Sequence, residues 1–196
     1  DGGIGDALVK FIIAKLAGAE IAGLQEVPIA HGAAAEMDAL LSGKVDAVVG
    51  TPPECIDAIR HGCKYLIDFA EYGLNYALGG IAGRRDYIEK NPDITRKFVK
   101  AYVEGMHRYR TDREFTVDVQ ADYSGIADRT IAEETYDLTQ PDMPRAPYPV
   151  VAALQTLLDF MANELPEAKG ADARKFVDDR FIRELEDNGF IASLDK

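Results

Sequence analysis

Short apolar runs alternate with helical patterns over the first third of the chain. Val45–Val49 is apolar except for Asp46, and Gly43 and Gly50 bound the run. A short run rich in β-branched residues is typical of a buried strand of a parallel sheet. The segments 23–29 and 65–69 show weaker patterns of the same kind. We therefore predict three strands in this part of the chain.

Helices are expected between these strands. Ala33–Ser42 carries apolar residues on one side, and a further helix is expected from Glu54 to about Arg60. Pro52 and Pro53 stop the preceding strand, because proline cannot donate to a ladder but is tolerated in the first turn of a helix. An earlier helix follows the glycine-rich turn at 2–6. The alternation indicates an α/β arrangement.

The pattern becomes almost entirely helical after Arg85. A loop with four prolines, Gln140–Pro149, interrupts it, because proline disfavours regular structure. Helices are expected at 86–91, 92–109, 112–123, 128–138, 150–165 and within 176–189. The chain thus combines a small βα part with a mostly helical C-terminal half.

Charge and composition narrow the function classes. The formal net charge is −12, which argues against a nucleic-acid surface, since such a surface needs a basic patch. No apolar run is long enough to span a bilayer. Cys55 and Cys63 lack the spacing and partners of a zinc site. Structural thiols are favoured, and a disulfide closed by a turn at Gly62 stays an alternative.

Strand-to-helix junctions are the candidate ligand contacts. In open α/β sheets, ligands bind beyond the carboxyl ends of the strands, where the next helix begins. Thr51 and His31 occupy two such junctions, and the turn around Gly3–Asp6 presents free backbone amides to an anion. We expect the three to converge at one edge of the sheet. Asp46 is expected to be hydrogen-bonded, since an unpaired buried carboxylate is costly.

Four segments carry a resemblance to a known family over essentially the whole chain. They are Ala39–Pro53 (ALLSGKVDAVVGTPP), Asn91–Tyr109 (NPDITRKFVKAYVEGMHRY), Tyr148-Pro149 and Phe176–Leu194 (FVDDRFIRELEDNGFIASL). In this order they resemble the solute-binding proteins of ABC importers in the nitrate/sulfonate/thiamine-precursor (NMT1/THI5-like) group. That resemblance implies a type II periplasmic binding protein fold. The N-terminal lobe of the family, and the strand expected before Gly2, have no counterpart here, so we expect an N-terminally truncated protein.

The resemblance also implies a domain organisation. Residues 1–75 would form the α/β second lobe, 76–83 the hinge, and 84–196 the helical C-terminal part of the first lobe. Carried over by position, the ligand contacts would be Gly3, Gly5, Asp6, His31, Gly32, Thr51, Pro52 and, in the hinge, Tyr76. No cofactor and no metal is implied.

The function that follows is a non-enzymatic, extracytoplasmic protein that delivers a small solute to a membrane permease. The solute would be anionic or heterocyclic, and the location periplasmic or extracellular, with a membrane anchor in the full-length form as one option. Two alternatives remain. One is an enzyme of the same fold, with His31 or Asp6 as acid or base, acting on a small cyclic acid or cofactor precursor. The other is the ligand-sensing lobe of a regulator, because fold does not fix function.

The apolar stripes of the helices at 92–109 and 150–165 have a further consequence. In a complete protein of this family they would cover the sheet of the first lobe. Without that partner, an exposed stripe of a few hundred Å2 costs several kcal/mol at ~25 cal/mol per Å2. We therefore expect either self-association of the chain or collapse of the helices onto each other.

Overall fold

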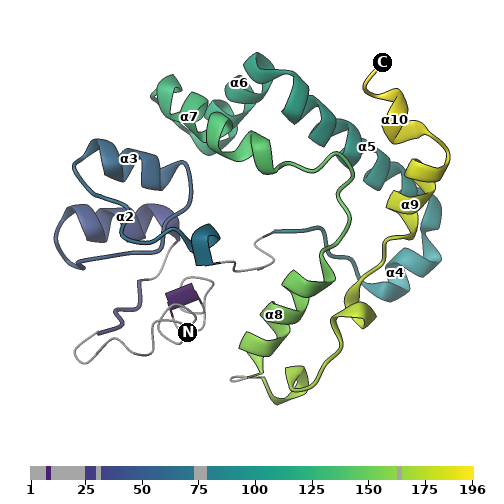
Figure 1. Cartoon of the computed structure of the whole chain (residues 1–196), viewed down its shortest axis with the longest axis horizontal. Coiled ribbons are helices and arrows are strands. Elements are labelled where there is room, and N and C mark those ends of the chain that lie inside the picture. Colours follow the sequence, from purple (N-terminus) through teal and green to yellow (C-terminus); the bar gives the residue numbers. More distant parts are fainter. Residues whose placement is uncertain (1–7, 10–24, 30–31, 73–78, 163–164) are drawn as a thin grey trace. The chain divides into compact units, whose positions relative to one another are not determined.

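The computed structural model describes residues 8–9, 25–29, 32–72, 79–162 and 165–196. The chain divides into two compact units, Asp1–Leu74 and Asn75–Lys196. Figure 1 shows the helices of each unit along the chain. Among the described residues, no helix combines the length and the apolar character needed to cross a membrane.

Within residues 32–72 of the first unit, α2 (Ala33–Leu41) and α3 (Glu54–Arg60) pack on each other, and the 3-10 turn η1 (Phe69–Tyr72) follows them. Met37 and Ala39 of α2 are buried, as are Cys55, Ile56 and Ala58 of α3. The predicted bounds of both helices are confirmed to within one residue. Proline and glycine mark these ends clearly in the sequence.

The predicted α/β fold is wrong for the described part of the chain. Residues 25–29, 45–50 and 63–68 lie outside the helices but form no strand, so no sheet of the type II periplasmic binding protein kind is present there. A strand exists only through hydrogen bonds to a neighbouring strand. None of these three short segments pairs with another described segment, although each has the local pattern of a strand.

The side chains of these segments are also more exposed than those of buried strands would be. Val45, Val48 and Val49 are half-buried rather than enclosed, and Tyr65 and Leu66 are 62% and 79% exposed. Asp46 is exposed as well, so the expectation of a hydrogen-bonded carboxylate in a buried strand is wrong. A carboxylate in contact with water needs no protein partner.

The second unit is helical, as predicted for this half of the chain. Its α-helices are α4 (Arg85–Lys90), α5 (Pro92–Thr111), α6 (Arg113–Ser124), α7 (Arg129–Thr139), α8 (Val151–Met161), α9 (Arg180–Asp187) and α10 (Phe190–Ser193). Three 3-10 turns connect them: η2 (Gln140–Asp142), η3 (Pro166–Ala168) and η4 (Ala173–Phe176). The helix α8 ends earlier than the predicted 150–165.

Local sequence explains where the long helices begin and end. Pro92 occupies the first turn of α5, where its missing N–H costs nothing. Asp112 separates α5 from α6, and its carboxylate caps α6 by accepting a hydrogen bond from the backbone N–H of Phe115 at 3.2 Å. Gly125 ends α6 in the left-handed conformation, with φ of 65°.

One apolar core of the second unit lies between α5 and the C-terminal helices. Val103 of α5 is 1% exposed and packs with Ile182 and Leu185 of α9 and Ile191 of α10. The ion pair of Arg96 with Glu184, at 2.7 Å, borders the same helix pair. These contacts hold the C-terminal segment on α5.

A second apolar core joins α6 and α7. Val117 and Ala132 are fully buried there and pack with Tyr136. A polar chain crosses this core: Thr139 Oγ1 donates to the Thr135 carbonyl at 2.8 Å and lies 2.5 Å from Tyr109 Oη. Because that donation uses the Thr139 proton, the Tyr109 hydroxyl is the donor to Thr139.

The apolar stripe predicted for the helix at 92–109 lies largely on the surface of α5, so that prediction is largely wrong. Of its residues, Ile94, Phe98 and Tyr102 are 55%, 53% and 40% exposed. Val99 and Val103, which lie outside the predicted stripe, face the core instead. The helix α9 packs on the side of α5 that carries these valines. Self-association through the exposed residues stays a prediction.

The α6–α7 core provides a test of the packing. Val117→Ala removes two methyl groups from a fully buried site, and we expect it to lower the free energy of unfolding by about 1.5–3 kcal/mol. Val119→Ala on the same helix changes a side chain that is 47% exposed, and should cost less than about 0.5 kcal/mol. Urea unfolding followed by circular dichroism measures both values. Equal losses in the two variants would contradict the described packing.

Candidate functional site

Thr51 lies where the segment 45–50 meets the N-terminus of α3. Its side chain is exposed, and its carbonyl accepts a hydrogen bond from the backbone N–H of Cys55 at 3.2 Å. The Pro53 carbonyl accepts from the amides of Ile56 and Asp57 at 3.1 and 3.3 Å. The Pro52–Pro53 peptide bond is cis, and Pro52 is half-buried. The backbone of Thr51 is therefore fixed by the first turn of α3, while its hydroxyl stays accessible to a ligand.

The backbone at Gly50 lies close to both α2 and α3. A Cβ atom at Gly50 would lie 2.8 Å from Met37 Cε of α2 and 3.3 Å from Cys55 Cβ of α3. Both distances are too short for an ordinary contact between carbon atoms. The absent side chain thus lets the backbone before Thr51 pack closely on α2 and α3.

Gly32 lies at the corresponding point before α2. It has φ of 82° and ψ of −172°, and its carbonyl accepts from the amides of Ala35 and Glu36 at 3.0 and 3.2 Å. The positive φ explains a glycine here, since residues with a Cβ avoid that conformation. Glycine also leaves the first amides of α2 without a side-chain cap from this position.

The structure describes three of the eight predicted contact residues: Gly32, Thr51 and Pro52. Gly3, Gly5, Asp6, His31 and Tyr76 lie outside the described residues, and their convergence with Thr51 stays a prediction. The reason given for that convergence, a shared sheet edge, does not hold for the described segments because they form no sheet. What Gly32 and Thr51 share instead is a position before one of two helices in mutual contact.

Charges near these helix N-termini are negative. Glu54 and Asp57 lie in the first turn of α3, and Glu36 lies in the first turn of α2. These carboxylates interact favourably with the positive end of each helix dipole. They also repel a second negative charge there, so the described part of the site is poorly suited to a strongly anionic ligand.

A hydrogen bond from Tyr65 connects the segment after α3 to that helix. Its hydroxyl donates to Cys55 Sγ at 3.2 Å, and this hydrogen bond is the largest cause that raises the pKa of Tyr65 to about 12. Partial burial and the neighbouring Asp68 act in the same direction. Cys55 is buried, Cys63 is partly exposed, and both are free thiols. The Cys55 side chain thus accepts a hydrogen bond from the segment after α3, and it also lies close to the backbone of Gly50, where an added Cβ would be 3.3 Å from its own.

Two features of this junction were missed by the sequence reasoning. Gly50 was interpreted only as the end of a strand, and Tyr65 as part of another strand. The glycine directly before Thr51 was the available signal for close packing, since glycine between apolar residues often marks an approach of backbone to a neighbour. The partner of Tyr65 is ten residues away and left no local signal.

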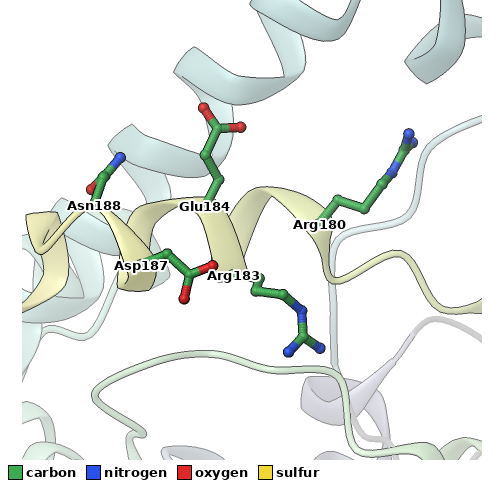
Figure 2. Close-up of a pocket in the computed structure, with 5 residues that line it drawn as sticks. All are labelled: Arg180, Arg183, Glu184, Asp187 and Asn188. Atoms are coloured by element: carbon green, nitrogen blue, oxygen red, sulfur yellow. The ribbon is translucent and has the colours of Figure 1, made fainter.

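An open hollow of about 520 Å3 on α9 is a weaker candidate. Figure 2 shows that its residues do not converge, because Glu184 and Arg180 extend to one side of the helix and Arg183 and Asp187 to the other. Its two arginines are also already paired: Arg180 with Asp178 at 2.7 Å and Arg183 with Asp179 at 2.5 Å. In the described part of the chain, no group of three or more His, Cys, Asp and Glu side chains is arranged to hold a metal ion.

Comparison with known families gives one match. The family described as NMT1/THI5 like matches residues 1–112, which is more than half of the 196-residue chain. The matched region includes α2, α3, α4 and α5 and all eight predicted contact residues. Comparisons with curated proteins and with solved structures give no match.

The Gly50 contact can be tested by adding a methyl group. Gly50 does not have a positive φ, so alanine fits the backbone, and the effect of Gly50→Ala reports the contact with Met37 and Cys55. Because Met37 Cε ends a flexible side chain that can move aside, we expect the contact with Cys55 Cβ to offset only part of the usual gain from glycine to alanine, so that Gly50→Ala changes the free energy of unfolding by less than about 0.5 kcal/mol. Gly105→Ala is the control. Its Cβ meets no atom within 4 Å in the middle of α5, and it should stabilise the chain by about 0.5–1 kcal/mol. A gain for Gly50→Ala as large as that for Gly105→Ala would contradict the close approach.

The Tyr65 hydrogen bond predicts a pH dependence. A phenol with a pKa of 10.0 when unfolded and about 12 when folded stabilises the fold fully below pH 10, and this contribution is lost as pH rises toward 12. The gap in the free energy of unfolding between the parent chain and Tyr65→Phe should therefore shrink over that range. Tyr123→Phe, at a side chain that is 92% exposed, controls for general alkaline effects. A gap for Tyr65→Phe that stays constant with pH in urea unfolding would rule out the assigned bond.

Proposed function

Because the chain belongs to the NMT1/THI5-like family, we propose that it is the solute-binding component of an ABC importer. The family match is the observation that carries this proposal, since the family includes proteins that bind small molecules. The partner would be a membrane permease, and the protein would act in the periplasm or outside the cell. Thr51, Gly32 and Pro52 are the described residues we assign to the ligand site.

Binding without chemistry suits the groups around Thr51. A hydroxyl becomes a nucleophile only beside a general base. The described histidine of this unit, His61, lies at the opposite end of α3, where its Nδ1 is 2.9 Å from the Asp57 carbonyl oxygen. Among the described residues, no base forms a hydrogen bond to the Thr51 hydroxyl. We therefore assign the hydroxyl the role of donating a hydrogen bond to a solute or accepting one from it.

The negative charges near the site favour some classes of solute over others. Glu36, Glu54 and Asp57 disfavour a multiply charged anion at the two helix N-termini. A neutral heterocycle with hydrogen-bonding groups, such as an aminopyrimidine, avoids this repulsion. We therefore propose a heterocyclic solute rather than nitrate or an alkanesulfonate.

A calorimetric panel tests this function. The whole chain is titrated with an aminopyrimidine, nitrate, an alkanesulfonate and an aromatic carboxylate. We expect the aminopyrimidine to bind most tightly, and Thr51→Val to weaken that binding by about tenfold, the loss of one hydrogen bond. Thr156→Val is the control. It also removes an exposed threonine hydroxyl, which donates to the Ala152 carbonyl on α8, and it should leave the affinity unchanged.

Three results would contradict the proposal. Failure of every member of the panel to bind would refute the assigned site. Recovery of a chemically altered pyrimidine, detected by mass spectrometry after incubation, would instead support an enzyme. Equal weakening by Thr51→Val and Thr156→Val would show that the effect is not local to the site.

A further inference from the structure

A hollow of about 410 Å3 lies between the segment 25–29 and one face of α2, apart from Thr51. Ala35, Asp38, Ala39 and Ser42 line it from α2 and its C-terminal turn. Positions separated by three, four and seven residues share one face of a helix. Pro28 and Ile29 form the facing wall.

The hollow exists because the floor residues are short. Ala35 and Ala39 extend only a methyl group from the helix, which leaves room beside the wall formed by Pro28 and Ile29. Ala39 is 6% exposed, and Ile29 is half-buried. The volume is of the size that small-molecule sites have, and the floor is apolar, as in such sites.

The end of α2 fixes a lysine at the rim of the hollow. Gly43 has φ of 71°, its N–H donates to the Leu40 carbonyl at 3.0 Å, and the Lys44 N–H donates to the Ala39 carbonyl at 2.9 Å. This pair of bonds is a Schellman motif, which turns the chain back over the helix end. Ser42 Oγ donates to the same Ala39 carbonyl at 3.2 Å and keeps its lone pairs available to accept. The backbone of Lys44 is thus held in place.

Asp38 and Lys44 supply opposite charges along this hollow. Both side chains are exposed, and within the described part of the chain neither forms an ion pair with the other or with a third residue. Asp38 lies near the C-terminus of α2, where the helix dipole is negative and a cation is favoured. A ligand with a positive and a negative group matches this pair.

We propose that the hollow binds a small zwitterion such as a free amino acid. The ammonium group would contact Asp38, the carboxylate would contact Lys44 and Ser42, and a short apolar side chain would lie on Ala35. This site is separate from the Thr51 site and does not depend on the proposed transport function. Because the hollow is open to solvent, we expect a dissociation constant of about 1 mM.

Titration of the whole 15N-labelled chain with L-valine tests the site by nuclear magnetic resonance. We expect saturable shifts of the Ser42, Gly43 and Lys44 amides. Isobutylamine lacks the carboxylate and N-acetylvaline lacks the ammonium group, and each should bind at least about tenfold more weakly, since each loses one charge-assisted contact. Absence of saturable shifts with L-valine, or equal binding of all three compounds, would overturn the proposal.

Matched variants locate the ligand. Ala35→Leu fills the hollow and should abolish the shifts, whereas Ala34→Leu, at an exposed position one residue away, should leave them intact. Lys44→Gln should weaken binding by about tenfold, and it tests the site even if Ala35→Leu lowers stability. Lys97→Gln, on the surface of α5, is its control. Loss of L-valine binding in Thr51→Val but not in Ala35→Leu would place the zwitterion at the other site and overturn this assignment.

Discussion

Apolar burial in the described part of the chain depends on helices packing against helices. The described segments outside the helices form no hydrogen bonds of the kind that pair strands, so no sheet is present there. Their apolar side chains therefore have no sheet surface to pack against. In the first unit, Met37 and Ile56 are buried on two short helices in contact with each other. In the second unit, Val103 and Val117 have the same role on longer ones.

This dependence explains which sequence predictions hold. Helix bounds are set by groups within a few residues, and Pro92, Asp112 and Gly125 mark them in the sequence and in the structure alike. A strand depends on a partner that can lie anywhere along the chain. Val45–Val49 has the composition of a strand, yet composition cannot state whether a neighbouring strand is present. The α/β prediction therefore failed because strands depend on residues distant in the sequence, and the helical predictions succeeded because helix ends depend on neighbouring residues.

Some features of the candidate site also have a local signal in the sequence, whereas others depend on distant residues. Thr51 was found because two prolines end a run and begin a helix, which is a local signal. The close packing of Gly50 on Met37 and Cys55, and the bond from Tyr65 to Cys55, join residues that are far apart in sequence or separated by a helix. The hollow on α2 combines both kinds of information. Gly43 marks the helix end locally, but the wall made by Pro28 and Ile29 depends on tertiary packing.

The positions of charged residues on the helices affect which ligands the chain can bind. The chain carries a formal charge of −12, so a binding site for an anion needs local positive groups that offset the overall field. The first turns of α2 and α3 lack them, because glutamate and aspartate already occupy the positive ends of these helices. Lys44 differs, since it follows the C-terminal end of α2 with no described ion-pair partner. A carboxylate held there by Lys44 would also meet the negative end of the α2 dipole, so the lysine charge has to outweigh that repulsion. The helix N-termini are better suited to hydrogen-bonding groups without charge.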